Sequence, residues 1–383
     1  NTFSTLYLWN LKEFNFKILR NKNIQYFILF FIISLISVLF ALNIQESIIE
    51  ITRIFNYVLT LVCLTLVSKK IEDPIKFISS IFSLALIIEL GVSYYEFQNI
   101  LLYTEYDFSQ ANLLQGIASN KNITASAMLL KLPFVLGYFL NKNLIIKIIA
   151  SFVSFAAIFM IYLLSARAMF IGLALFYTIL FFLILFFYND SFKFKISNIF
   201  KLFFPLIAST TLFLVVYNKN NSVSLVSRAS TINTNDESTN QRIRFYKHGL
   251  NHVVENPLIP TGIGNWKILS IKYDNKDMIG YVVPYHLHND FLQFSAELGI
   301  IGGLAYVMVF FITMLQNFKK LYSKYLKRSL LIKEGFPLSL LILLSLLIFI
   351  IDSNLNFPFS RPMIMIPLII VLSLSNYHNE KHS

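Results

Sequence analysis

The sequence predicts an all-α, polytopic integral membrane protein with about ten transmembrane helices and one large extracytoplasmic loop that contains short helices. Of its 383 residues, 56% are hydrophobic and only 14% are charged, and the mean hydropathy is +0.65. A soluble domain is nearer half apolar and a quarter charged. The 39 Phe and 20 Tyr residues are typical of lipid-facing surfaces and interfacial belts.

The third observation is a series of apolar runs, each about long enough to cross a bilayer, which takes about 20 residues. Each run must be helical, because lipid offers no partner for unpaired backbone groups. About seven spans fall within 1–217 and about three within 296–383, on either side of a loop at 218–295. The runs are 24–43, 51–68, 75–95, 123–140, 144–164, 168–188, 199–217, 296–316, 336–352 and 362–376.

The positive charges predict the orientation of these helices. Lys and Arg collect at the N-terminal segment, in alternate short loops and at the C-terminal tail, whereas the other short loops, 44–50 and 98–119, carry none. Cytoplasmic loops are enriched in Lys and Arg, so we expect both termini in the cytoplasm and the loop 218–295 outside. This pattern also explains the formal charge of +12. No compact basic and aromatic module accompanies it, which argues against nucleic-acid binding.

The large loop has three parts. A polar stretch at 218–240 is rich in Asn, Ser and Thr. The segment 241–255 places Ile243, Leu250 and Val254 on one face, which predicts an amphipathic helix on the membrane surface. Prolines and glycines at 257–264 predict a turn, and a second helix is expected to begin near His288 and to enter the membrane at about Ala296.

Four of the six histidines lie in this loop. His286 and His288 stand at the mouth of a transmembrane helix, where free amide groups and the helix dipole favour anions. A neutral imidazole there could act as a general base near pH 7. The alternative is chance clustering of loop histidines. His378 and His382 lie in the polar tail, where we expect them to be solvated.

His248 and His252 have the i, i+4 spacing that can bind zinc. The glutamate of an HExxH motif is missing, because Gly249 follows His248. The only cysteine, Cys63, lies in an apolar run, which excludes a disulfide and a cysteine zinc site. We therefore predict no metal or cofactor, and place both histidines on the wet face of the amphipathic helix.

Arginines are the natural partners of phosphate, since the guanidinium donates paired hydrogen bonds. Arg167 lies between two apolar runs on the predicted outer side, and Arg242 and Arg244 begin the amphipathic segment. Snorkelling to the interface would explain any one of them. Three arginines on the same side as four histidines favour an anion site.

Three charges fall inside the second, third and fourth apolar runs: Arg53, Glu89 and Lys131. Charges inside a membrane are costly and often functional. Glu89 and Lys131 could pair across adjacent helices, which would be a structural role, or the charges could line an ion path. No inverted repeat supports a carrier.

These residues resemble motifs of the O-antigen ligase and polymerase family of bacterial envelope glycosyltransferases. The His-Asn pair 288–289, nine residues and the Gly-x-x-Gly of 299–302 match the ligase-type pattern. Four further elements follow the family's order, over roughly residues 110–310: Gly116 to Asn122, with Lys121 where Pro is usual; Ser165 to Arg167; Arg242 to Tyr246, with Tyr for Trp; and Asn256 to Trp266, with Pro260 for the first Gly. Relatives have about twelve membrane helices, so we expect helices upstream of Asn1.

The resemblance implies a metal-independent glycosyltransferase without cofactors, in the bacterial inner membrane, with its active loop in the periplasm. The donor would be an undecaprenyl-diphosphate-linked glycan, and the acceptor lipid A-core or a growing glycan. Arg167 and Arg242 would hold the diphosphate and His288 would activate the acceptor hydroxyl or hydrogen-bond the phosphate. We expect Arg244, His286, Asn289 and Asn122 to bind substrate.

Four readings of this function remain. The His-Asn-x9-Gly-x-x-Gly match favours an O-antigen ligase over a polymerase of the same family, in which another lipid-linked repeat is the acceptor. A transporter or flippase for lipid-linked glycans would use the intramembrane charges and dispense with the loop histidines. A non-catalytic assembly scaffold would also dispense with them.

Overall fold

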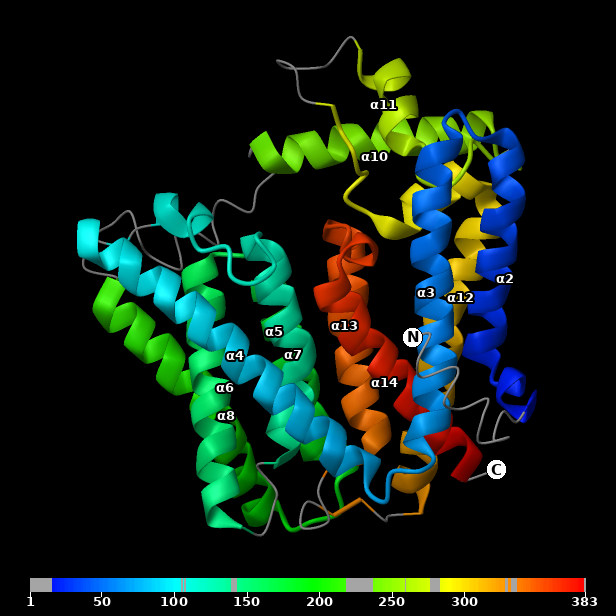
Figure 1. Ribbon diagram of the computed structural model, residues 1–383. Coiled ribbons are helices and arrows are strands. Elements are labelled where there is room, and N and C mark those ends of the chain that lie inside the picture. The colour runs from blue at the N-terminus through cyan, green and yellow to red at the C-terminus, as the bar shows by residue number, and fades with distance from the viewer. Residues whose placement is uncertain are drawn as a thin grey trace. The chain divides into compact units, whose positions relative to one another are not determined.

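The computed structural model describes residues 16–104, 106, 108–138, 143–217, 237–258, 260–275, 283–327, 330–331 and 336–381 (Figure 1). Over these residues every regular element is a helix, and eight helices are long and apolar enough to cross a membrane. The predicted all-α, polytopic membrane fold is confirmed. The chain forms two compact units: residues 1–72, 234–316 and 353–383 make the first, and residues 73–233 and 317–352 the second.

The first unit is a helical bundle around an aromatic core. Within it α14 packs against α3, and α3 against α2. The ring of Phe359 lies edge-on to Phe294 and Tyr306, at centroid distances of 4.8 and 5.6 Å. Its helices are α2 (Lys22–Ser37), α3 (Ile44–Ser68), α10 (Glu237–Glu255), α11 (Trp266–Asp274), α12 (Asp290–Leu326) as far as residue 316, and α14 (Pro362–Lys381), with short 3-10 turns η1 (Phe16–Arg20), η2 (Val38–Phe40) and η7 (Pro358–Ser360).

The second unit is built around α5 (Lys121–Gly137), in which every side chain from 123 to 136 is buried. Helices α4, α6 and α7 pack against it. The Lys131 ammonium lies 2.8 Å from the Glu89 carboxylate of α4, and both side chains are buried, so the predicted pairing across adjacent helices is confirmed. The other elements are α4 (Pro74–Tyr103), η3 (Phe108–Asn112), α6 (Leu144–Leu164), α7 (Arg167–Phe187), α8 (Phe192–Tyr217), the end of α12, and α13 (Leu338–Leu355) as far as residue 352.

All ten predicted apolar runs coincide with helices, and α5 and α14 are the two that fall outside the eight candidate spans. Both predicted short outer loops are partly helical: residues 44–50 form the first turns of α3, and residues 98–103 belong to α4. Asn43 explains the early start of α3, because its side-chain oxygen accepts hydrogen bonds from the amides of Gln45 (2.9 Å) and Glu46 (3.4 Å). A side chain that caps free amides in this way begins a helix.

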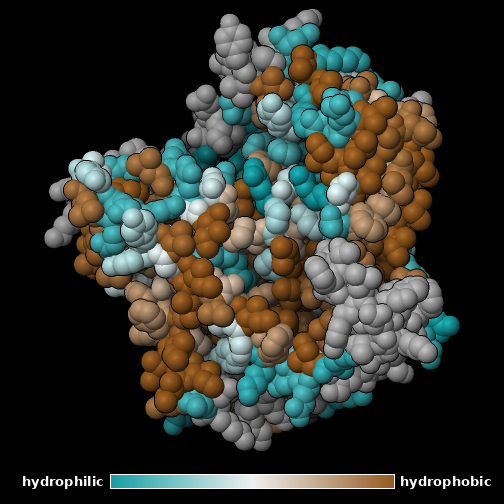
Figure 2. Space-filling view, in the orientation of Figure 1, coloured by the Kyte–Doolittle hydropathy of each residue, from teal (hydrophilic) through white to brown (hydrophobic). Residues whose placement is uncertain are grey.

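The outer faces of several helices carry large exposed apolar side chains. On α2 these are Leu29, Ile32, Leu35 and Ile36, and on α6 they are Ile145, Ile148, Ile149 and Phe152. Figure 2 shows the α2 surface as a continuous brown band. Contiguous apolar surface of this extent is rare on soluble proteins and is what a lipid environment requires.

Helix α10 runs crosswise to α2 and α3 of the same unit (Figure 1). Its residues Ile243, Leu250 and Val254 are exposed by 37, 52 and 78%. The predicted amphipathic helix is therefore confirmed, beginning at Glu237 rather than Gln241. An exposed apolar face on a helix outside the transmembrane spans supports the expectation that α10 lies along a membrane surface.

Candidate active site

The turn after α10 fits closely against the connection between α2 and α3. Gly262 and Gly264 adopt φ of 90° and 78°. A Cβ on Gly262 would lie 2.6 Å from Cα of Ala41, and one on Gly264 would lie 3.0 Å from the carbonyl oxygen of Glu46. Only glycine combines these torsions with such close approach, which explains the two glycines of the Asn-Pro-Leu-type motif.

Glu297 of α12 holds the far end of this turn. Its carboxylate accepts hydrogen bonds from the amides of Gly264 (2.8 Å) and Trp266 (3.0 Å) and from the Gln293 side chain (3.2 Å). The side chain is buried, and a buried carboxylate requires such donors. Glu297 was not among the residues predicted from the sequence, although an acidic residue in an apolar run is a visible signal.

Gly299 kinks α12 beside the same turn. Its torsions are φ 73° and ψ 172°, so the helix is interrupted there. The freed amide of Ile300 donates to the carbonyl of Pro257 at 2.9 Å. A Cβ on Gly302 would lie 2.3 Å from Cβ of Leu298. The Gly-x-x-Gly element thus lets α12 bend and receive the turn from α10.

The buried face of α10 is polar as well as apolar. Arg244 forms an ion pair with the fully buried Asp274 of α11 at 2.9 Å, and His248 lies 3.4 Å from the same carboxylate. Nδ1 of His252 lies 3.0 Å from the Tyr273 hydroxyl. The expectation that both histidines occupy the wet face was wrong: both side chains are buried, in contact with these partners.

The His286–His288 segment precedes α12 and meets the connection between α13 and α14. The ring of Phe357 stacks on His286, with centroids 4.2 Å apart and planes 10° from parallel. The same ring meets His288 edge-on at 5.0 Å, and Phe245 of α10 lies 6.3 Å from His288 on a nearly parallel plane. His288 is therefore packed between two aromatic rings, and His286 is stacked on one of them.

His288 has an unusual backbone. Its φ is 54°, in the left-handed region that non-glycine residues rarely adopt. The Tyr246 hydroxyl lies 2.9 Å from its carbonyl oxygen and 2.7 Å from that of Asn354. Nδ1 of the imidazole is buried and has no hydrogen-bond partner among the described residues. Strained residues that surroundings hold in place cluster at functional sites.

Asn289 and Asp290 fix the start of α12 and orient this segment. The Asn289 side chain accepts from the amide of Leu292 at 3.0 Å, as an N-terminal helix cap. The buried Asp290 carboxylate accepts from the amide of Phe359 at 3.0 Å. The predicted helix start near His288 is confirmed at Asp290.

Positive charge surrounds the two histidines. Burial, followed by the positive charge of Arg242, lowers the pKa of His288 to about 4, and repulsion from His286 adds to this when that ring is protonated. Burial also lowers the pKa of His286 to about 4, with Arg361 among the nearby cations that contribute. Arg242 itself reaches the Asn356 side chain at 3.4 Å. In the free protein both imidazoles are neutral at pH 7, beside guanidinium groups that favour an anion.

Arg167 and Asn122 belong to the second unit. Arg167 begins α7, directly after the left-handed turn at Ser165 (φ 54°), which accounts for the Ser-x-Arg element. Asn122 lies in the first turn of α5, where the Asn120 side chain accepts from its amide at 3.0 Å. Their approach to the His288 segment stays a prediction, whereas His286, His288, Asn289, Arg242 and Arg244 share the first unit.

An apolar groove of about 390 Å³ adjoins the histidine segment. Tyr246 and Asn289 stand at this groove, and its remaining lining is mostly apolar and comes from α10 and α12, as far as Val307. Its exposed apolar walls suit a hydrocarbon chain.

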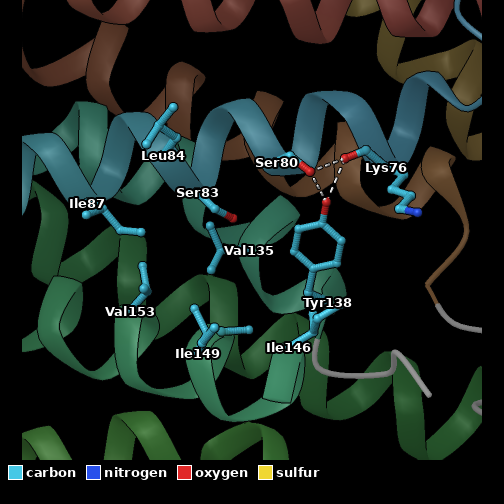
Figure 3. Close-up of a pocket in the computed structure, with 11 residues that line it drawn as sticks. Lys76, Ser80, Ser83, Leu84, Ile87, Val135, Tyr138, Ile146, Ile149 and Val153 are labelled. Atoms are coloured by element: carbon cyan, nitrogen blue, oxygen red, sulfur yellow. Dashed lines mark hydrogen bonds between the residues drawn. The ribbon is translucent and has the colours of Figure 1, made fainter. Parts of the chain in front are cut away.

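Two other pockets lie in the second unit, and no loop histidine lines either. A pocket of about 310 Å³ lies between α4, α5 and α6 (Figure 3), where the Tyr138 hydroxyl lies 2.6 Å from both the Ser80 hydroxyl and the Lys76 carbonyl. A larger one of about 660 Å³ is lined by apolar side chains such as Phe97 and Phe152. Among the described residues, neither pocket is lined by a histidine or a carboxylate.

The intramembrane charges have local partners. Arg53 pairs with Glu50 at 2.5 Å, and Lys131 pairs with Glu89. Each pair is a structural explanation for its charges, which weakens the argument for a transport path. In the part of the chain that the structure describes, no group of three or more His, Cys, Asp or Glu side chains is placed to hold a metal ion.

A comparison with protein families finds a match over part of the chain. Residues 152–307 match the family described as O-antigen ligase. This part of the chain is therefore similar to the O-antigen ligase family. The match contains Arg167, Arg242 and His288, and it ends within α12. No curated protein matches the chain.

The match and the eight candidate membrane spans together support a membrane protein with a function of the general O-antigen ligase and polymerase type. The prediction that the two tail histidines are solvated was wrong for His378, which is buried in α14. His382 lies outside the described residues.

Proposed function

We propose that the protein transfers a preformed glycan from undecaprenyl diphosphate to lipid A-core at the periplasmic face of the bacterial inner membrane. One observation carries the proposal. A buried, neutral His288 with an unpartnered Nδ1 stands beside Arg242, within the region matched to the family. A proton acceptor beside a phosphate-binding cation is what glycosyl transfer from a diphosphate carrier requires.

The proposed reaction has one bond formed and one broken. The acceptor hydroxyl oxygen attacks the anomeric carbon, and the bond between that carbon and the diphosphate oxygen breaks. The hydroxyl proton passes to His288, and undecaprenyl diphosphate leaves with the bonding electron pair. Arg242 and Arg167 stabilise the charge that builds on the leaving group. The pKa of His288 is low in the free protein. The bound diphosphate raises this pKa towards 7, since an opposite charge favours the protonated imidazole.

Other residues support binding. Asn289 borders the apolar groove along α12, which suits the polyprenyl chain of the donor. His286 lies beside His288 and is neutral, so it can donate a hydrogen bond to phosphate. Arg244 forms an ion pair with Asp274, so it contributes to substrate binding indirectly, because this ion pair helps to position α10. Asn122 completes the predicted binding set from the second unit. No metal or cofactor takes part in the proposed reaction.

The periplasmic orientation rests on the distribution of Lys and Arg between alternate loops. It places α10 and the histidine segment on the side where lipid A-core is accessible to a membrane enzyme. Membrane embedding then keeps a lipid-linked donor and a lipid acceptor at the same depth.

An in-vitro transfer assay tests the proposal. Purified protein receives undecaprenyl-diphosphate glycan with or without lipid A-core, and products are separated by size. We expect one lipid A-linked product that requires the acceptor, and its loss in His288→Ala but not in the control His382→Ala. A ladder of longer lipid-linked chains without lipid A-core would instead assign a polymerase. Near wild-type transfer by His288→Ala would sink the proposed role of this histidine.

A further inference from the structure

The segment between α13 and α14 lies outside the region matched to the family, yet it forms part of the candidate site. The carbonyl of Asn354 lies 2.7 Å from the Tyr246 hydroxyl, and the Asn356 side chain reaches Arg242. Phe357 packs on both histidines. Residues 354–361 therefore contact both α10 and the histidine segment and help to fix their positions.

Arg361 ends this segment, and one nitrogen of its half-buried side chain, Nε, has no hydrogen-bond partner within the described residues. Its Cζ lies 4.9 Å above the centroid of Phe357, on the ring that also carries His286. Its Nε is buried and has no hydrogen-bond partner, and Arg361 has no ion pair in the described part of the chain. A buried charged donor without an acceptor costs free energy, and such a cost is offset when a ligand supplies the acceptor.

The neighbouring cations differ from Arg361 in this respect. Arg53 is neutralised by Glu50 at 2.5 Å, and Lys267 by Glu46 at 2.5 Å. Arg361 thus leaves a local excess of positive charge next to His286. The carboxylates already engaged on Arg53 and Lys267 make an external anion the natural partner for Arg361.

We propose that Arg361 is a further binding residue of this site, which holds one phosphate of the diphosphate-linked donor beside His286. The inference rests on the proposed function and adds to it a residue from outside the family-matched region. The guanidinium lies over the ring of Phe357, and its Nε is buried. Phosphate chemistry is shared by the donor diphosphate and by anionic phospholipid headgroups, and the two sources are separated by experiment.

The test measures binding of undecaprenyl diphosphate to the full chain in nanodiscs, with undecaprenol as the phosphate-free comparison. Variants are Arg361→Gln, Arg361→Lys, Arg242→Gln and the matched control Arg20→Gln, which removes the same charge from an exposed position on η1. We expect Arg361→Gln to weaken binding about tenfold or more, because a hydrogen bond between charged groups is lost. Arg361→Lys should retain part of the affinity, and Arg20→Gln all of it.

Each outcome decides. Unchanged binding by folded Arg361→Gln, together with weaker binding by Arg242→Gln, overturns the inference and leaves the proposed function standing. Absence of wild-type binding to undecaprenyl diphosphate removes the proposed donor itself. If excess phosphatidylglycerol displaces the ligand from wild type but not from Arg361→Gln, the site is a phospholipid headgroup site and the inference falls. Thermal unfolding separates a binding defect from misfolding, and Arg361→Lys gives a second reading should Arg361→Gln fail to fold.

Discussion

The imidazole of His286 stacks on the ring of Phe357 at a centroid distance of 4.2 Å, with the two planes 10° from parallel. The same phenyl ring meets His288 edge-on and lies beneath the Arg361 guanidinium. One apolar side chain therefore orients three groups that are able to contact an anion or a proton. In such an arrangement, preorganisation of the polar groups comes from aromatic packing as much as from hydrogen bonds.

Replacement of this ring should separate activity from stability. We expect Phe357→Leu to lower kcat/KM for glycan transfer at least tenfold, because His286, His288 and Arg361 lose their common support. The free energy of unfolding should fall by only about 1–2 kcal/mol, in line with the worth of aromatic pairs and partial loss of burial. The transfer assay and thermal unfolding measure the two effects.

Phe182→Leu is the matched control for that substitution. Phe182 is exposed by 51% on α7 of the second unit, so both activity and unfolding should stay close to wild type. Equal activity in Phe357→Leu and Phe182→Leu would contradict the supporting role of the Phe357 ring.

The two histidines should make stability depend on pH. Burial, then nearby positive charge, lowers the pKa of His286 and of His288 to about 4. The cations acting on these histidines are Arg242, Arg361, Arg53 and Lys267. In the unfolded chain both titrate near the ordinary value of about 6.5. Their contribution is therefore fully present above about pH 6.5 and is lost as the pH falls to about 4.

Thermal unfolding of wild type and His286→Asn between pH 4 and 7.5 measures this dependence. The melting temperature of wild type should fall relative to that of the variant as the pH drops through this window, since asparagine does not titrate. A difference between the two proteins that stays constant with pH would show that His286 is not held neutral by its surroundings.

Much of the fold could be predicted from the sequence because the membrane imposes strict rules. Each of the ten apolar runs became a helix, and the pairing of Glu89 with Lys131 followed from the cost of charges in lipid. The amphipathic pattern of α10 was visible because its apolar side chains recur on one face. The start of α3 was missed because a single capping residue, Asn43, moved the boundary.

The site was harder to predict, because its geometry depends on long-range packing. The spacing of His248 and His252 indicates a shared helix face, but nothing in it reveals that Asp274 and Tyr273 cover that face. Phe357 and Arg361 follow the large loop by about 70 residues, and no local pattern connects them to His286. The left-handed torsion of His288 likewise follows from tertiary contacts rather than from propensity.

The buried pair in the second unit predicts a non-additive effect on stability. Lys131→Met or Glu89→Leu alone should destabilise the protein by about 3–5 kcal/mol, because each leaves an uncompensated buried group. The double variant Lys131→Met with Glu89→Leu should recover most of this loss. Thermal unfolding of the four proteins gives the coupling energy. Additive losses would show that the two side chains act independently.

That pair also distinguishes an enzyme from a carrier. If the charges serve structure, the double variant should retain glycan transfer in proportion to the amount of folded protein. Transfer assayed in reconstituted vesicles, with the donor on the same side as the active loop, measures this directly. If the double variant folds but has lost all activity, Lys131 and Glu89 have a functional role and not only a structural one.

The kink in α12 gives a prediction with an internal control. Gly299 has a φ of 73°, and an added Cβ would lie 3.1 Å from the carbonyl oxygen of Pro257, so Gly299→Ala should destabilise the protein by about 1–3 kcal/mol. Gly91 lies inside α4 with nothing within 4 Å of an added Cβ, so Gly91→Ala should be neutral or stabilising by up to about 1 kcal/mol. The turn at 257–264, which packs against the kink, also binds Glu297. Gly299→Ala should therefore shift the histidine segment and lower transfer by more than the loss of folded protein explains. Comparison of kcat per folded molecule in the two alanine variants measures this additional loss, and equal values would show that the kink does not affect the reaction.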